Sequence, residues 1–128
     1  MLLLSKCGNQ GKEQGNRCMN KLIDSLTGIP TAKRDLRLPL MCCNYFQMEE
    51  CIEREAIKIG KPSCPESSIE LINQLLEAYT GDALNFVCRD YTREDDKCSK
   101  IIHLTPPPAP DKRPIAVLTP FFRILESV

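Results

Sequence analysis

Cysteine is the residue type whose number and spacing in this sequence point most directly to chemistry. The 128 residues include eight cysteines, namely Cys7, Cys18, Cys42, Cys43, Cys51, Cys64, Cys88 and Cys98. Cysteines bind zinc or join in disulfides, and zinc sites favour a C-x-x-C spacing with histidine nearby. The sequence has no C-x-x-C, and its single histidine, His103, follows the last cysteine. We therefore predict that all eight cysteines form disulfides, and we predict no metal site and no cofactor.

Disulfides on this scale indicate an oxidising compartment, so we predict a secreted, extracellular protein. Residues 1–4 read Met-Leu-Leu-Leu, which is shorter than the apolar region of about 7–15 residues that a signal peptide needs. We interpret them as the remnant of a truncated signal peptide, and an incidental start is the alternative. No apolar run approaches the about 18 residues of a transmembrane helix, so we predict no membrane span.

The adjacent pair Cys42-Cys43 restricts how the disulfides can be arranged. Neighbouring cysteines rarely bond to each other because the required geometry is strained. On a helix their side chains point about 100° apart, so each must reach a different partner. Our hypothesis is that this helix is the hub of the fold, with one of the pair bonded to Cys18 and the other to Cys88.

Apolar residues recur at helical spacing through the middle of the chain, as at Cys18, Leu22 and Leu26 four residues apart. This pattern predicts an all-α domain. Gly28 with Pro30, Gly60 and Gly81 are expected to end helices, and Pro39 is expected to stand at the start of one. No segment before residue 99 shows the alternation typical of a strand. The predicted helices cover 17–26, 40–59, 64–80 and a shorter segment from about 82 to 91.

The predicted fold is therefore a small disulfide-stapled bundle of about four helices over residues 17–98. Residues 1–16, with three glycines among polar residues, are expected to be a flexible N-terminal segment. Residues 99–128 are expected to be a Pro-rich tail with an apolar end, because six of the ten prolines lie within 106–120. Proline favours extended polyproline II, so we expect 105–114 to be poorly packed. The apolar end is expected to pack on the helices, to bind a partner, or to have no structural role.

Charge excludes one class of partner for the whole chain. Lysine and arginine number 17, as do aspartate and glutamate, so the formal net charge is zero. A protein that binds nucleic acid electrostatically is strongly basic, so we predict no nucleic-acid partner. The first 37 residues hold seven basic and three acidic residues, while residues 38–98 hold six basic and twelve acidic. Such a bipolar surface can orient a protein partner, although charged helix faces are usually just solvated.

The segment around Cys42-Cys43 resembles the catalytic helix of secreted phospholipases A2, in which a histidine activates water and an aspartate helps to hold calcium. Phe46 stands where that histidine would be and Gln47 where the aspartate would be. Hydrolysis needs a base that can accept a proton near neutral pH, and this segment has none. His103 has no partner near it in sequence. We therefore predict that the protein is not an enzyme and has no catalytic residues.

Plant lipid-transfer proteins also have a Cys-Cys pair at the third and fourth of eight cysteines, as Cys42-Cys43 are here. Their C-x-C is missing, because twelve residues separate Cys51 from Cys64. This resemblance lies in the architecture, helices stapled around apolar space. It raises carriage of a lipid or another small apolar ligand between the helices as a function.

A second pattern extends through the predicted domain: Cys42-Cys43-Asn44-Tyr45-Phe46, then Cys51-Ile52-Glu53, Cys64, Cys88-Arg89-Asp90-Tyr91 and Cys98. Over residues 7–98 it resembles secreted cysteine-rich helical proteins of arthropods, of the haemolymph-glycoprotein and tick or spider secreted type. The resemblance implies an extracellular location and a helical fold, and that family has no general activity. We predict a secreted, non-catalytic binding protein for an extracellular protein, with carriage of an apolar ligand as the alternative.

Overall fold

The computed structural model describes residues 2–91, 96–109 and 124, and within them the fold is all-α, as predicted. No β-strand occurs among these residues. The α-helices are α1 (Leu2–Gln10), α2 (Lys12–Gly28), α3 (Arg34–Ile59), α4 (Glu66–Val87) and α5 (Asp96–Ile101), and two 3-10 turns are η1 (Ile29–Thr31) and η2 (Ile102–Leu104). None of the described helices combines the length and the apolarity that crossing a bilayer requires.

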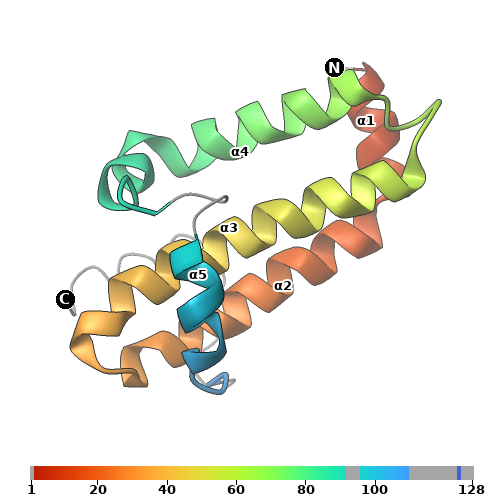
Figure 1. The fold of residues 1–128 in the computed structure, drawn as a ribbon. Coiled ribbons are helices and arrows are strands. Elements are labelled where there is room, and N and C mark those ends of the chain that lie inside the picture. Colours follow the sequence, from red (N-terminus) through yellow and green to blue (C-terminus); the bar gives the residue numbers. More distant parts are fainter. Residues whose placement is uncertain (1, 92–95, 110–123, 125–128) are drawn as a thin grey trace.

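Helix α3 is the centre of the arrangement (Figure 1). Helix α2 lies antiparallel along one side of α3, and α4 returns antiparallel along another. Helix α1 contacts α2, α3 and α4 at the end where α3 finishes, and α5 packs against α3. Every other α-helix among the described residues therefore touches α3.

The main hydrophobic core lies between α2 and α3. Leu22 and Leu26 on α2 are 2% and 1% exposed, which confirms the apolar stripe expected from their four-residue spacing. Leu40 and Met41 of α3 are fully buried against them. Burial of each side chain of this size contributes about 1.5–3 kcal/mol, so this seam holds the two helices in register.

Four disulfides join all eight cysteines: Cys7–Cys64, Cys18–Cys51, Cys42–Cys88 and Cys43–Cys98. Helix α3 is the hub, as we predicted, and the predicted bond to Cys88 is present. The predicted bond from Cys18 to the adjacent pair is wrong. Because α2 and α3 are antiparallel, Cys18 near the start of α2 lies beside Cys51 in the second half of α3, and the second cysteine of the pair bonds to Cys98 instead.

The N-terminal segment is helical where a flexible segment over 1–16 was expected. Helix α1 occupies Leu2–Gln10, and α2 begins at Lys12 rather than at residue 17. The disulfide between Cys7 and Cys64 explains why this segment is ordered, because it fixes α1 against the chain that leads into α4. Cys7 is 3% exposed and forms a second small core with Cys64 and Ala56.

Two further helix boundaries differ from the prediction. Helix α3 begins at Arg34, so Pro39 lies inside it rather than at its start. Helix α4 continues through Gly81 to Val87, so the two predicted helices are one. A glycine inside a helix costs only about 1 kcal/mol, and the bond from Cys88 to α3 fixes the chain immediately after the helix. The predicted end at Gly60 is confirmed, with φ of +64° that favours glycine.

The chain after α5 packs on the helices through residues 105–109, which we call the strap. The Asn44 side-chain amide donates a hydrogen bond to the Thr105 hydroxyl at 3.0 Å. The Ala109 backbone N–H donates to the Thr27 hydroxyl at 2.9 Å. We expected 105–114 to be poorly packed, and this is wrong for the strap because polar side chains on α2 and α3 hold it. Residues 110–114 lie outside the described residues.

The apolar end of the chain is described at one position. Ile124 is fully buried and belongs to the main core with Leu26 and Leu40. At this residue the chain packs on the helical body, which is one of the three roles left open by the sequence. The rest of 115–128 lies outside the described residues.

Candidate functional site

Two neighbouring hollows flank α3. The first, between α2 and α3, has a volume of about 130 Å³. The second, between α3 and the α5–η2 segment, has a volume of about 270 Å³. Gln47 and Glu50 line both hollows and are exposed, so they form a ridge on α3 that separates the two. We call the ridge and its two hollows the ridge face.

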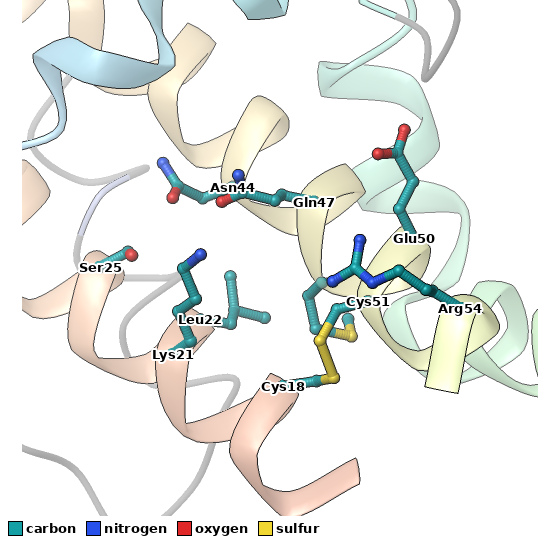
Figure 2. A pocket seen from close by; sticks show the side chains of 10 residues that line it. Cys18, Lys21, Leu22, Ser25, Asn44, Gln47, Glu50, Cys51 and Arg54 are labelled. Atoms are coloured by element: carbon teal, nitrogen blue, oxygen red, sulfur yellow. A yellow bond between two sulfur atoms is a disulfide. The ribbon is translucent and has the colours of Figure 1, made fainter. Parts of the chain in front are cut away.

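The first hollow is polar and has a disulfide in its lining (Figure 2). Lys21 and Ser25 project from α2 on one wall, and Arg54 reaches back along α3 toward Cys51 on the other. Leu22 and Met48, both buried, contribute the apolar part of the lining. Two cationic groups and one carboxylate, that of Glu50, therefore meet in a space large enough for a few waters or one side chain.

The second hollow is more apolar. The Cys43–Cys98 disulfide lines it together with Phe46 from α3 and Ile102 from η2. Ser99 and the two ridge residues supply its polar groups. This arrangement suits an apolar side chain at its centre, with hydrogen-bonding groups around the edge.

Asn44 connects the first hollow to the strap. Its side chain is 5% exposed, lines the hollow, and donates to the Leu40 carbonyl at 2.8 Å as well as to Thr105. Both bonds come from the same amide nitrogen, so the side-chain orientation is fixed from two directions. The strap thus holds one residue of the site in place.

The eight cysteines fall into two groups. Cys18, Cys51, Cys43 and Cys98 line the hollows as disulfides, whereas the other four cysteines lie within the two cores or beside them. His103 is exposed on η2 and belongs to neither hollow. Within 2–91, 96–109 and 124, no cluster of three or more histidine, cysteine or acidic side chains is arranged to hold a metal ion.

Sequence reasoning did not identify Lys21, Ser25 or Gln47 as site residues. Each is an ordinary polar residue on an exposed helix face, and only the antiparallel register of α2 and α3 brings them together. Only the cysteines could have indicated this site, because the Cys18–Cys51 bond fixes the register in which α2 and α3 face each other.

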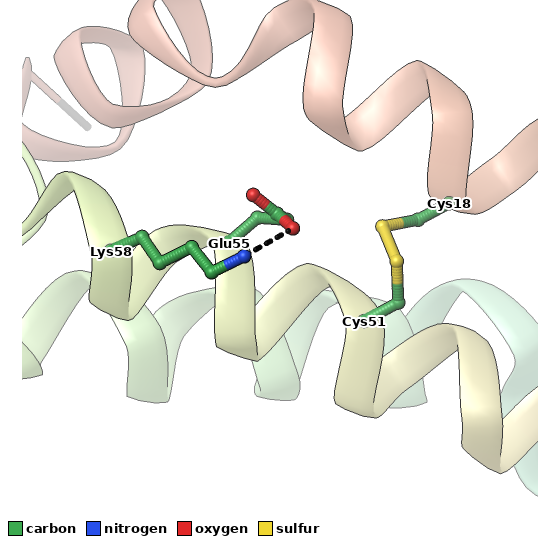
Figure 3. Close-up of polar contacts among 4 residues, drawn as sticks. All are labelled: Cys18, Cys51, Glu55 and Lys58. Atoms are coloured by element: carbon green, nitrogen blue, oxygen red, sulfur yellow. Dashed lines mark hydrogen bonds and ion pairs between the residues drawn. A yellow bond between two sulfur atoms is a disulfide. The ribbon is translucent and has the colours of Figure 1, made fainter.

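Helix α3 has an exposed ion pair one turn beyond this site. The Lys58 ammonium lies 3.3 Å from a Glu55 carboxylate oxygen (Figure 3). The Lys58 side chain is 65% exposed, so the pair adds less than about 1 kcal/mol to stability. Lys58 does not line either hollow, which makes it a matched control for Arg54 on the same helix.

Comparison with known proteins gives no relative from which a function could be transferred. No protein-family model matches the chain, no curated protein is significantly similar in sequence, and no solved structure is significantly similar in fold. The resemblance to secreted arthropod proteins therefore stays a prediction, and a function finds its support in the disulfides and the ridge face of this chain.

Proposed function

We propose that this protein is a secreted, non-catalytic binding protein that recognises an extracellular protein through the ridge face. The observation that carries the proposal is that every cysteine is in a disulfide, with no free thiol. Four such bonds in a chain of 128 residues are typical of proteins that work in an oxidising environment.

The disulfides also make the ridge face rigid. Three of the four bonds start on α3 and connect it to α2, to the residue that follows α4 and to α5. Two of these bonds line the hollows themselves. A surface held in its bound shape loses little conformational entropy on association, which favours binding.

The charges and hollows of the ridge face support a partner of a particular chemistry. An acidic side chain fits between Lys21 and Arg54, and an apolar side chain fits the second hollow beside Phe46 and Ile102. Glu50 on the ridge disfavours a second acidic group at the centre. We therefore expect the partner to present one acidic and one apolar side chain on neighbouring turns, and the association to weaken as salt rises.

The test is photo-cross-linking in the extracellular fluid of the source organism, with a benzophenone amino acid at Gln47. A control protein has the same group at Lys58, on the same helix but outside both hollows. We expect one partner to cross-link from Gln47 and not from Lys58, and we expect Lys21→Glu with Arg54→Glu to reduce that product about tenfold. Equal products from both positions, or a product that these changes leave unaltered, would contradict the proposal.

Carriage of an apolar ligand has weaker support. Pockets that enclose ligands of drug size have volumes of about 300–1,000 Å³. The two hollows of the ridge face, at about 130 and 270 Å³, are smaller than that. The ridge face therefore suits side chains of a protein partner better than a whole lipid.

A further inference from the structure

The four disulfides differ in how easily a reagent can reach them. In two of them both cysteines are at most 3% exposed. In each of the others one cysteine is half-buried, namely Cys51 in the bond with Cys18 and Cys98 in the bond with Cys43. The two buried bonds are Cys7–Cys64 and Cys42–Cys88. Attack on a disulfide needs access to one sulfur, so the two partly exposed bonds react first.

The hollows around the two reachable bonds have linings of opposite net charge. The hollow that contains Cys18–Cys51 is lined by Lys21, Arg54 and Glu50, two cations and one anion. Among the described residues that line the hollow containing Cys43–Cys98, Glu50 is the only one with an ionisable side chain. The lining of the first hollow therefore attracts an anion, and the lining of the second repels it.

We propose that the Cys18–Cys51 disulfide is a site of thiol–disulfide exchange with small anionic thiols, the class of carboxylate-bearing peptide thiols such as glutathione. The thiolate sulfur of the reagent attacks Cys51 Sγ and forms a mixed disulfide. The bond to Cys18 Sγ breaks, and that sulfur leaves with the electron pair and takes up a proton. The mixed disulfide is the modified state, and a second reagent thiolate reduces it to the free Cys51 thiol and an oxidised reagent dimer.

Lys21 and Arg54 carry the specificity. They attract the carboxylate of the reagent, and positive charge beside a leaving sulfur favours its thiolate form. The Arg54 side chain reaches toward Cys51, while Lys21 stands on the opposite wall (Figure 2). The carboxylate of the reagent is thus attracted from both sides of Cys51 Sγ, the sulfur that the reagent thiolate attacks.

The experiment measures both bonds in one folded sample. The native protein is treated at low salt with mercaptoacetate, 2-mercaptoethanol or cysteamine, which are anionic, neutral and cationic. Differential alkylation followed by peptide mass spectrometry then gives the rate at which each disulfide opens. The ratio of the rates at Cys18–Cys51 and Cys43–Cys98 cancels the intrinsic reactivity of each reagent.

We expect this ratio to be about fivefold higher for mercaptoacetate than for 2-mercaptoethanol, lower for cysteamine, and nearly independent of the reagent in about 1 M salt. Changing both Lys21→Gln and Arg54→Gln should remove the preference for the anionic reagent, whereas Lys58→Gln should leave that preference unchanged. Equal ratios for all three reagents would overturn the proposal. It would also be overturned if the Cys18–Cys51 bond opened only when the buried Cys42–Cys88 bond opened with it. These outcomes do not depend on a protein partner, so the proposed function can fail or succeed separately.

Discussion

Alanine at Gly28 tests whether the strap is a fixed part of the fold. Gly28 has φ of −85° and ψ of −27°, a helical conformation that alanine adopts without strain. Helix propensity alone therefore predicts that Gly28→Ala stabilises the protein by about 0.5–1 kcal/mol. A methyl group at this position would instead collide with the Pro107 carbonyl oxygen and lie 2.8 Å from that of Pro106.

The expected cost follows from the contacts that the collision breaks. If the strap moves away, the hydrogen bonds of Thr105 to Asn44 and of Ala109 to Thr27 are lost. Each bond contributes about 0.5–1.5 kcal/mol, and the nearly buried Asn44 amide loses a partner. Against the gain in helix propensity, we expect a net loss of about 1–2 kcal/mol in the free energy of unfolding.

Gly15→Ala is the matched control, because it makes the same change in the same helix. A methyl group at Gly15 would meet nothing within 4 Å, so this variant should gain about 0.5–1 kcal/mol. Guanidinium denaturation with the disulfides intact, followed by circular dichroism at 222 nm, gives both values. Hydrogen exchange at the Ala109 amide should become faster in Gly28→Ala only. Equal stabilisation of both variants would show that the strap does not rest on Gly28.

Three further predictions concern the strap, α1 and the hollows. Thr105→Val removes the hydroxyl that accepts a hydrogen bond from Asn44 and should lower the free energy of unfolding by about 1–2 kcal/mol in the same denaturation assay. A change near zero would show that water replaces this hydrogen bond. Replacing both Cys7 and Cys64 by alanine opens a loop of 57 residues and should lower the free energy of unfolding by about 4 kcal/mol through chain entropy. Proteolysis within α1 should become faster in this variant. Unchanged resistance to proteolysis would mean that packing alone holds α1. A fluorescent fatty acid at micromolar concentration should show no saturable change on binding, and a saturable change at one site per chain would favour carriage of an apolar ligand over protein binding.

The sequence by itself determined the class of fold and its covalent character. Apolar spacing at Cys18, Leu22 and Leu26 predicted the buried face of α2, and the structure confirms that all three are buried. The adjacent pair Cys42-Cys43 predicted that α3 is the hub, because neighbouring cysteines on a helix point in different directions. These properties follow from local geometry, which depends only on residues close together in the chain.

Tertiary structure decided the disulfide partners, the path of the strap and the composition of the ridge face. The pairing of Cys18 with Cys51 follows from the antiparallel register of α2 and α3, which no local pattern encodes. The strap is ordered because Thr27 and Asn44, more than 60 residues away in sequence, donate or accept its hydrogen bonds. Contacts between distant residues depend on how whole helices pack, and that packing is a property of the complete core rather than of any segment.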